Sequence, residues 1–379
     1  MIYADHNATS VIRPEAKAAM VAAMEVGANP SSVHSAGRKA RKLLETARSQ
    51  IGGTISASGK DIIFTSGGTE ANRLALIGAA RQIAAKEGKP PAIIYAGFEH
   101  AAVLENLPDT GATLLQVRVK TSGVVDLGHL AELIRRVSEE GFTPLVTLML
   151  ANNETGVIQP VAEAAAMARE ARGYIHCDAV QALGKIPVNV ALLGVDYLAL
   201  SGHKCGGPAG VGALWLRSGA PLLPIHKGGG QERSLRSGTE NLVGIVGFGA
   251  AAEKSVQDLD LYSRLSLIRD AMESDLKAAG AIVFGNEAGR LANTSCIALP
   301  GFKSETQVMS LDLAGIAISA GSACSSGKVK ASGVLKAMGV SEDIARCAVR
   351  ISFGWDTADD DGAAIASAWK EAAARVVGQ

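Results

Sequence analysis

The sequence predicts an α/β protein with a large, mainly parallel sheet and a smaller α+β domain. Short apolar runs that read as buried strands alternate with helix-like segments, which is the pattern of a parallel sheet with crossover helices. The chain has 379 residues, 47% of them hydrophobic, which is enough for one large core and a second, smaller one.

The first two thirds of the chain predict the large sheet. Strand-like runs occupy residues 61–65, 92–96, 144–150, 173–175, 197–200 and 211–216. Helical segments occupy residues 70–87, a short stretch near Ala101, and residues 161–172. The apolar run at 243–252 is too short to span a bilayer and predicts a buried helix.

The remainder of the chain predicts the smaller domain, which follows a long helix at 258–279. Short strands are expected at 281–284, 294–299, 316–318 and 348–353. A last helix is expected at 358–377, with Thr357 as its N-cap and three aspartates in its first turn, where the helix dipole favours negative charge.

Composition argues against several classes of protein. Lys+Arg and Asp+Glu both number 37, and this zero net charge predicts neither nucleic acid nor an anionic membrane as a partner. The start of the chain lacks the basic and apolar regions of a signal peptide, so we expect a cytoplasmic protein. Five cysteines without a CxxC spacing argue against a disulfide framework and against a zinc site.

An aspartate and a lysine follow two of the predicted strands. Asp178 comes after the run at 173–175 and Lys204 after the run at 197–200, so both are expected at carboxyl ends of strands, where open α/β sheets bind ligands. Pyridoxal phosphate requires this pair, because a lysine amine binds its aldehyde as a Schiff base and a carboxylate keeps its pyridine nitrogen protonated. The sequence therefore predicts a pyridoxal phosphate site.

The glycine-containing turn at residues 65–70 is a candidate site for the phosphate. Its glycines allow backbone amides to approach an anion, and the N-terminus of the following helix favours negative charge. Taken alone, the turn reads as an ordinary loop with Thr69 as N-cap. Together with Asp178 and Lys204, it favours phosphate binding.

Further polar residues follow strand-like runs. His100 is expected to stack on the pyridine ring and to relay protons, since imidazole titrates near neutrality, or else to be a cap or core residue. Asn152 is a candidate donor to the cofactor or the substrate, whereas Asn153 is interpreted as a turn residue. Gln181 is expected either to face the cofactor O3′ or to cap the helix after Asp178.

Two other places suggest anion binding. Residues 228–231 and 236–239 precede a helix and predict either a second anion site or a flexible surface loop. Arg350 lies in the strand-like run at 348–353 and needs an anionic partner, which is either a substrate α-carboxylate or a structural Asp or Glu.

Cys324 is the candidate nucleophile. It lies in a stretch of small and polar residues, 319–327, which is expected to be exposed rather than packed in a core. A free thiol has a pKa of about 8.5, so such a role implies that the thiol is activated. The other cysteines are interpreted as packing residues: Cys177, Cys205, Cys296 and Cys347.

The chain resembles the cysteine desulfurases of the NifS/IscS type, in the class V aminotransferase superfamily, from about residue 4 to residue 354. The motifs that carry the resemblance are Ala4-Asp5-His6-Asn7-Ala8-Thr9, Asn29-Pro30-Ser31-Ser32-Val33-His34-Ser35, Thr65-Ser66-Gly67-Gly68-Thr69-Glu70-Ala71-Asn72, Arg236-Ser237-Gly238-Thr239-Glu240-Asn241 and Gly321-Ser322-Ala323-Cys324-Ser325-Ser326-Gly327. The resemblance implies the fold-type I architecture of pyridoxal phosphate enzymes, with a large domain at 16–257 and a small domain formed by 1–15 and 258–379.

The resemblance also implies a role for each candidate. Lys204 would carry the cofactor, Asp178 would pair with its pyridine nitrogen, and His100 would stack on its ring. Arg350 would hold the substrate carboxylate, and Cys324 would accept the sulfur and is a candidate transient iron–sulfur ligand. The remaining contacts to the phosphate, the O3′ side and the substrate would come from Gly68, Thr69, Asn152, Gln181, Ser201 and His203, and from Thr239 of the neighbouring subunit of a homodimer.

The activity that the resemblance implies is conversion of L-cysteine to L-alanine, with a persulfide formed on Cys324. The sulfur would pass to an acceptor such as an iron–sulfur scaffold protein. The alternatives are a selenocysteine lyase, another class V aminotransferase, and a non-enzymatic scaffold of the same fold. The presence of Lys204, Asp178 and Cys324 speaks against the last of these.

The sequence departs from the family pattern at three places. Residues 205–209 replace a turn that usually contains an aromatic residue and a lysine. Trp355-Asp356 stands where Arg-Phe is usual. The chain ends at Gln379, without the longer tail by which IscS-type members bind their scaffold, so that mode of docking is not expected.

Overall fold

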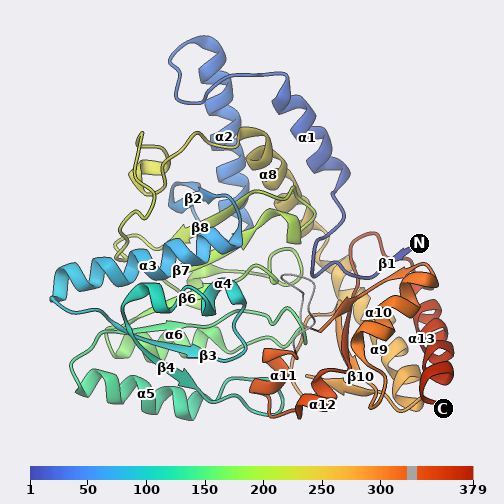
Figure 1. The fold of residues 1–379 in the computed structure, drawn as a ribbon. Coiled ribbons are helices and arrows are strands. Elements are labelled where there is room, and N and C mark those ends of the chain that lie inside the picture. The colour runs from blue at the N-terminus through green and yellow to red at the C-terminus, as the bar shows by residue number, and fades with distance from the viewer. Residues whose placement is uncertain (322–330, 379) are drawn as a thin grey trace.

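A seven-stranded sheet forms the larger part of the molecule, a computed structural model that describes residues 1–321 and 331–378 (Figure 1). The strand order is β2-β8-β7-β6-β5-β3-β4, and β8 alone is antiparallel to its neighbours in this sheet. The bounds are β2 (Ile62–Thr65), β3 (Ala92–Ala96), β4 (Thr113–Val117), β5 (Pro144–Thr147), β6 (Tyr174–Asp178), β7 (Tyr197–Ser201) and β8 (Gly212–Leu216). The predicted α/β class with a mainly parallel sheet is confirmed.

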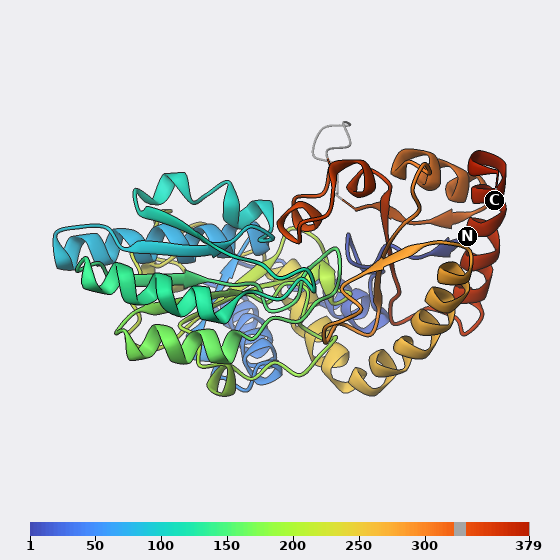
Figure 2. The ribbon, with the colours of Figure 1, turned by 90° about the horizontal axis from the view of Figure 1, so that it is seen from below.

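Helices cover both faces of this sheet (Figure 2). Successive residues of a strand point to opposite faces, so Ile63 and Ile93 pack in the core under α3, whereas Ile62 and Ile94 pack in the core on the other side. The covering helices are α3 (Gly68–Glu87) and α4 (Ala101–Leu104) on one face, and α5 (Leu127–Glu139), α6 (Val161–Glu170) and α7 (Val190–Leu193) on the other.

Three helices pack together at the top of Figure 1: α1 (Pro14–Met24), α2 (Ser35–Thr54) and α8 (Leu242–Gln257). The sequence predicted the middle of α8 but neither α1 nor α2. The buried face of α2 repeats at three- and four-residue intervals, with Ala40, Leu44, Ala47 and Ile51 in the large core. In the described ranges, none of the helices combines the length and apolar character that crossing a membrane requires.

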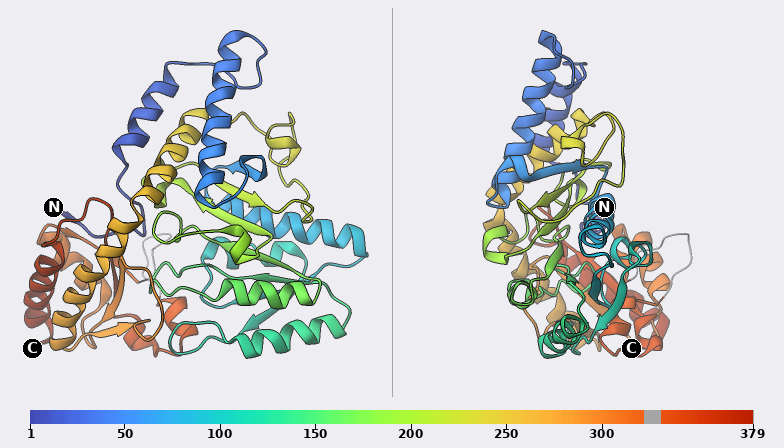
Figure 3. Two further views of the ribbon diagram at one scale, coloured as in Figure 1. Left: turned by 180° about the vertical axis from the view of Figure 1, so that it is seen from behind. Right: turned by 90° about the vertical axis from the view of Figure 1, so that its left-hand side faces the viewer.

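The smaller sheet has the order β12-β13-β10-β9 and is antiparallel. Both chain ends lie beside it, because β1 pairs with β11 and the last helix packs against α9 (Figures 1 and 3). The strands are β1 (Ile2–Tyr3), β9 (Ile282–Phe284), β10 (Thr294–Ala298), β11 (Ile316–Ala317), β12 (Ser319–Ala320) and β13 (Ala348–Ser352). The helices are α9 (Leu259–Ala278), α10 (Ser304–Leu313), α11 (Gly333–Ala337), α12 (Glu342–Ala345) and α13 (Asp361–Val377). The domain boundaries at 15/16 and 257/258 stay predictions.

Two sequence-based expectations in this part were wrong. Thr357 is not the N-cap of the last helix, because its hydroxyl accepts a hydrogen bond from the amide of Gly354 (2.8 Å) and closes a turn there. The carboxylate of Asp361 accepts from the amide of Ala358 (2.9 Å), and α13 begins only at Asp361. The single strand expected at 316–318 is divided, since β11 pairs with β1 and β12 pairs with β13.

Residues 4–13, which we call the N-terminal arm, run from the small sheet to the turn after β7. The carbonyl of Ala4 accepts from the amide of Ser352 (2.8 Å), and the amide of Ser10 donates to the carbonyl of His203 (2.8 Å). The amide of Arg13 donates to the carbonyl of Gly206 (2.8 Å). The arm is therefore bonded to both parts of the molecule.

The side chain of Arg13 is buried where the arm, this turn and the start of α9 meet. Its Nε donates to the carbonyl of Cys205 (3.0 Å), its Nη1 bonds Asp258 (2.6 Å), and its guanidinium lies 5.4 Å from the centre of the Trp355 ring. Gly206 has a φ of +89°, and a Cβ there would lie 2.6 Å from Cγ of Arg13. This glycine therefore leaves the room that the arginine fills.

We predict that Gly354→Ala destabilises the protein by about 2 kcal/mol or more, because an added Cβ would lie 2.0 Å from the ring of the buried His6. The midpoint of urea denaturation measures the effect. Gly53→Ala is the matched control, since Gly53 lies in α2 with nothing within 4 Å of the added methyl group, and it should be neutral or stabilising. Equal midpoints for the two variants would contradict the prediction.

Candidate functional site

A cavity of about 310 Å³ lies at the carboxyl ends of β6 and β7, beside the N-terminal arm. It brings together most of the residues singled out in the sequence. The predicted residues that line it are Gly68, Thr69, His100, Asp178, Gln181, Ser201, His203, Lys204 and Arg350. Others that line it include Asn7 and Ala8 of the arm, Asn72 of α3, and Asn153.

Asp178 ends β6 and is held in one orientation by two donors. Its Oδ2 accepts from Nδ2 of Asn72 (2.7 Å) and its Oδ1 accepts from the amide of Val180 (3.0 Å). Asn72 is fixed in turn by the buried His176, whose Nε2 lies 3.0 Å from Oδ1 of Asn72. Burial lowers the pKa of His176 to about 3, so this ring is neutral and supports the carboxylate without adding charge.

Lys204 lies in the 3₁₀ turn after β7, with its amine directed at the N-terminal arm. Its Nζ donates to the backbone carbonyls of Asn7 (2.6 Å) and Ala8 (2.7 Å). Burial, with a further contribution from the Arg350 guanidinium, lowers the pKa of Lys204 to about 8. About a tenth of the amine is therefore unprotonated at pH 7, which a nucleophilic lysine requires.

The turn before α3 presents a helix N-terminus to the cavity. The N-cap is Gly67, so the interpretation of Thr69 as N-cap was wrong, and Thr69 lies in the first turn with its amide free of intrahelical partners. A Cβ at Gly68 would lie 2.6 Å from Cγ2 of Val180, so only glycine lets the turn approach the loop after β6 this closely. This arrangement suits an anion.

Desolvation lowers the pKa of both histidines of the cavity. His100 is the N-cap of α4, accepting from the amide of Ala102 (3.0 Å), and burial lowers its pKa. His203 contacts the hydroxyl of Thr9 (3.0 Å), and burial together with Lys204 lowers its pKa to about 4. His100 is thus both a helix cap and a residue that lines the cavity.

The two neighbouring asparagines differ in what they contact. Oδ1 of Asn152 accepts from the amides of Glu154 (2.9 Å) and Thr155 (3.0 Å), which is the turn that had been assigned to Asn153. Asn153 lines the cavity instead. Gln181 also lines it, with its Nε2 bonded to the carbonyl of Asn7 (2.9 Å) rather than capping a helix.

Arg350 is buried in β13 and is bonded through two of its three nitrogens. Its Nη2 pairs with Asp5 (2.7 Å) and its Nη1 donates to the carbonyl of Asn153 (3.1 Å). Within the described residues its buried Nε has no hydrogen-bond partner. The structural acid expected as one alternative is therefore present, and Arg350 also lines the cavity.

The segment at 228–241 does not contribute Thr239 to this cavity. Thr239 is exposed, and Arg236 is paired with Glu70 (2.8 and 3.1 Å). The segment is anchored by Glu232, which accepts from Arg48 (2.7 and 2.8 Å) and from the amide of Phe64 (2.8 Å). These bonds hold three consecutive non-glycine residues, 232–234, at positive φ.

Cys324 lies outside the described residues.

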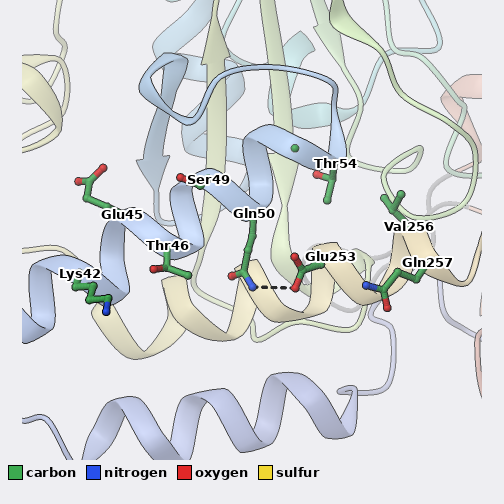
Figure 4. Close-up of a pocket in the computed structure, with 10 residues that line it drawn as sticks. Lys42, Glu45, Thr46, Ser49, Gln50, Thr54, Glu253, Val256 and Gln257 are labelled. Atoms are coloured by element: carbon green, nitrogen blue, oxygen red, sulfur yellow. Dashed lines mark hydrogen bonds between the residues drawn. The ribbon is translucent and has the colours of Figure 1, made fainter.

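A larger hollow of about 730 Å³ lies between α2 and α8, and none of the predicted site residues lines it (Figure 4). Gln50 and Glu253 meet across it, with Nε2 donating to Oε2 at 2.9 Å. It is open to solvent, and its labelled side chains come from the outer faces of the two helices. Size alone therefore does not mark the site, whereas the converging polar groups of the smaller cavity do.

A family model described as aminotransferase class-V matches residues 2–362. The chain belongs to this family. It is 40% identical to "Cysteine desulfurase IscS" of Dictyoglomus turgidum, over 95% of this chain and 91% of that relative. It is 42% identical to "Cysteine desulfurase" of Cereibacter sphaeroides, over 94% of this chain and 92% of that one. Among solved structures, a NifS-like protein from Rickettsia africae matches with a TM-score of 0.89 and 34% identity, covering 98% of this chain and 99% of that one.

The cavity also has a neighbouring acid that sequence reasoning missed. Glu99 is buried beside His100, with Oε1 accepting from the amide of Met149 (2.7 Å). Burial, and then the charge of Asp178, raise the pKa of Glu99 to about 8. The only sequence signal was its position beside His100 after a predicted strand.

We predict that Glu99→Gln changes how stability depends on pH. Because the pKa of Glu99 is raised from 4.5 to about 8, the folded state keeps a proton that the unfolded state loses, and this contribution to stability is lost as pH rises from about 5 to 8. The free energy of unfolding of the variant minus that of the parent should therefore rise by up to about 1.4 kcal/mol per pH unit in this range. Urea denaturation at pH 5, 6, 7 and 8 measures it, and parallel curves would contradict it.

Proposed function

We propose that this chain is a pyridoxal phosphate-dependent cysteine desulfurase that converts L-cysteine to L-alanine and transfers the sulfur to Cys324. The observation that carries the proposal is the joint presence in one cavity of a desolvated lysine amine and an oriented carboxylate at neighbouring strand ends. The names of the relatives, which match nearly the whole chain, give the substrate.

The residues of the cavity fit the cofactor. Its volume is at the lower end of the roughly 300–1,000 Å³ typical of ligand pockets. Lys204 would hold the aldehyde, Asp178 the pyridine nitrogen, and His100 the ring face. The phosphate would be bound at the α3 N-terminus by Gly68 and Thr69, with Ser201 and His203 beside it, and Gln181 would face O3′. When bound, pyridoxal phosphate supplies an electron sink for the bond-breaking step.

The protein side chains would position the substrate and move its protons. Asp178, oriented by Asn72, would keep a proton on the pyridine nitrogen. Lys204, once displaced by the substrate amine, would carry the proton to and from Cα, and its pKa of about 8 suits that exchange near neutral pH. The guanidinium of Arg350, which lines the cavity, would bind the α-carboxylate, and the substrate would compete with Asp5 for it.

Cys324, as a thiolate, would attack the sulfur of the substrate: an S–S bond would form as the Cβ–S bond breaks, the electron pair of that bond would stay with the substrate carbon, and a proton taken up there would complete the methyl group of alanine. The thiol would then carry the sulfur away as a persulfide. The support from the described residues is where the chain enters this segment. β12 ends at Ala320, and its Ser319 pairs with Arg350 in β13 while its hydroxyl donates to Asp5 (2.9 Å). The segment that contains the thiol therefore starts beside the group proposed to bind the substrate carboxylate.

The proposal includes a cytoplasmic homodimer and a sulfur-acceptor protein. Thr239 would bind the cofactor phosphate in the partner subunit, which agrees with its exposure and its absence from the cavity of its own chain. The acceptor would be an iron–sulfur scaffold or another thiol-bearing protein, with Cys324 as the donor.

We predict that the chain loaded with pyridoxal phosphate gains one sulfur atom on the peptide that contains Cys324 after incubation with L-cysteine, and that a thiol reductant removes it. Peptide mass spectrometry measures this. Cys324→Ala should abolish the modification, whereas Cys347→Ala, which removes a buried thiol elsewhere, should leave it unchanged. Sulfide release by Cys324→Ala at the rate of the parent would rule out the role of this thiol.

We predict that two defective chains complement each other in a mixed dimer. Lys204→Ala inactivates its own site, and Thr239→Ala should weaken cofactor binding in the partner's site about tenfold or more, since a hydrogen bond to a charged group contributes about 1.5–3 kcal/mol. In a mixed dimer, one site has both Lys204 and Thr239. Co-expression should therefore restore sulfide release above that of either variant alone, and a simple average of the two activities would argue against shared sites.

A further inference from the structure

A second lysine, Lys185, is buried next to the cavity in the turn that follows β6. It is 5% exposed, and within the described residues it forms no ion pair. Its Nζ donates to two side-chain oxygens, Oδ1 of Asn7 (2.7 Å) and Oε1 of Gln181 (2.7 Å). Both acceptors are neutral amides, and both residues line the cavity. Burying a charged amine without a carboxylate partner is costly.

The Lys185 amine is held in one position by its two acceptors, each 2.7 Å away. Burial, and then the positive charges of Lys204 and Arg350, lower the pKa of Lys185 well below its usual range. The geometry of these two bonds is what Lys185 contributes to the cavity wall.

The two lysines meet at Asn7. Lys185 bonds the side-chain oxygen of Asn7, and Lys204 bonds its backbone carbonyl (2.6 Å). Gln181 closes the ring of contacts, because its Oε1 accepts from Lys185 while its Nε2 donates to the same carbonyl of Asn7 (2.9 Å). One face of the cavity is thus a hydrogen-bonded network that joins Lys185, Gln181, Asn7 and Lys204. The Asn7 side chain has further partners in Asn293 (3.2 Å), Thr294 (2.9 Å) and the carbonyl of Asn153 (3.2 Å).

We propose that Lys185 is a positioning residue for Lys204: its amine fixes Asn7 and Gln181, and so keeps the carbonyl of Asn7 in place as the acceptor for the Lys204 amine. The inference rests on the proposed function only in taking Lys204 as the reactive amine. It adds to that function a residue that touches neither cofactor nor substrate in the arrangement proposed above.

Other groups also act on the Lys204 amine, and the test must hold them constant. The charged and titratable groups that act on this amine are Asp5 of the arm, Asp178 of β6, His203 of the 3₁₀ turn, His100 at the start of α4, and Arg350 of β13. None of these donates to or accepts from Lys185. Replacing Lys185 with methionine keeps an unbranched side chain of similar length, so water should not fill the site.

The experiment measures the titration of Lys204 in the full-length chain with the cofactor removed. Trace acetylation by acetic anhydride modifies only unprotonated amines, and peptide mass spectrometry reports the rate at Lys204 as a function of pH. In the parent the midpoint should be near 8. In Lys185→Met the Asn7 carbonyl is no longer held in place as an acceptor for the Lys204 ammonium. The midpoint of the Lys204 titration should therefore fall by about half to one pH unit. Acetylation of Lys204 at pH 6.5 would then be about three- to tenfold faster.

The alternatives give different results. An unchanged midpoint would mean that Lys185 only fills space, and a raised midpoint would mean that it acts as a repelling positive charge; either result overturns the proposal. Lys254→Met is the matched control, because it removes an amine from α8 outside the cavity and should leave the midpoint unchanged.

A second variant keeps the test decisive if Lys185→Met does not fold. Asn7→Ala removes the acceptor of Lys185 and should also lower the midpoint, and the double variant should shift it by less than the sum of the two single shifts. Additive shifts would show that Lys185 acts by another route. The outcome is independent of the persulfide test, since a chain that formed no persulfide on Cys324 would still report the coupling of the two lysines.

Discussion

The amine of Lys204 is buried against two backbone carbonyls, and this contact constrains much of the molecule. Carbonyls of Asn7 and Ala8 reach it only because the N-terminal arm leaves the small sheet and crosses to the turn after β7. The arm is held at one end by Ser352 and at the other by the backbone of the Lys204 turn. The first strand of the chain accordingly pairs with β11 beside the small sheet, although the cavity that the arm serves lies mainly at the edge of the large one.

The ionisable groups around the cavity are shifted by their surroundings. Desolvation lowers the pKa of His100 and His203, and burial raises the pKa of Glu99 to about 8 and that of Glu154 to about 7. The positive groups Lys204 and Arg350 face the carboxylates of Asp178 and Asp5. A phosphate or a substrate carboxylate would therefore compete with these acids for the two cations.

The sequence predicted the fold class and much of the cavity, because strand ends in a parallel sheet meet at one edge. Asp178, Lys204 and the turn at 65–70 were found in this way. Asn152 and Asn153 could not be told apart, since which of two adjacent amides turns back to the backbone depends on packing. The edge strand β4 was missed because Thr113 and Gln116 leave an apolar run of only two leucines between them. The amphipathic pattern of α2 was present, but alanines and glycines made it inconspicuous.

The contact between Arg13 and Gly206 joins two of the places where this sequence departs from its family pattern. The turn at 205–209 is one of them, and Trp355, whose ring lies over the arginine, is the other. A residue with a side chain at 206 would occupy the volume of the Arg13 methylenes, so the arginine could not keep its bonds to Cys205 and Asp258. If residues 205–209 were replaced with the corresponding loop of a relative, positions 13 and 355 would have to be replaced at the same time, because the three segments pack against one another.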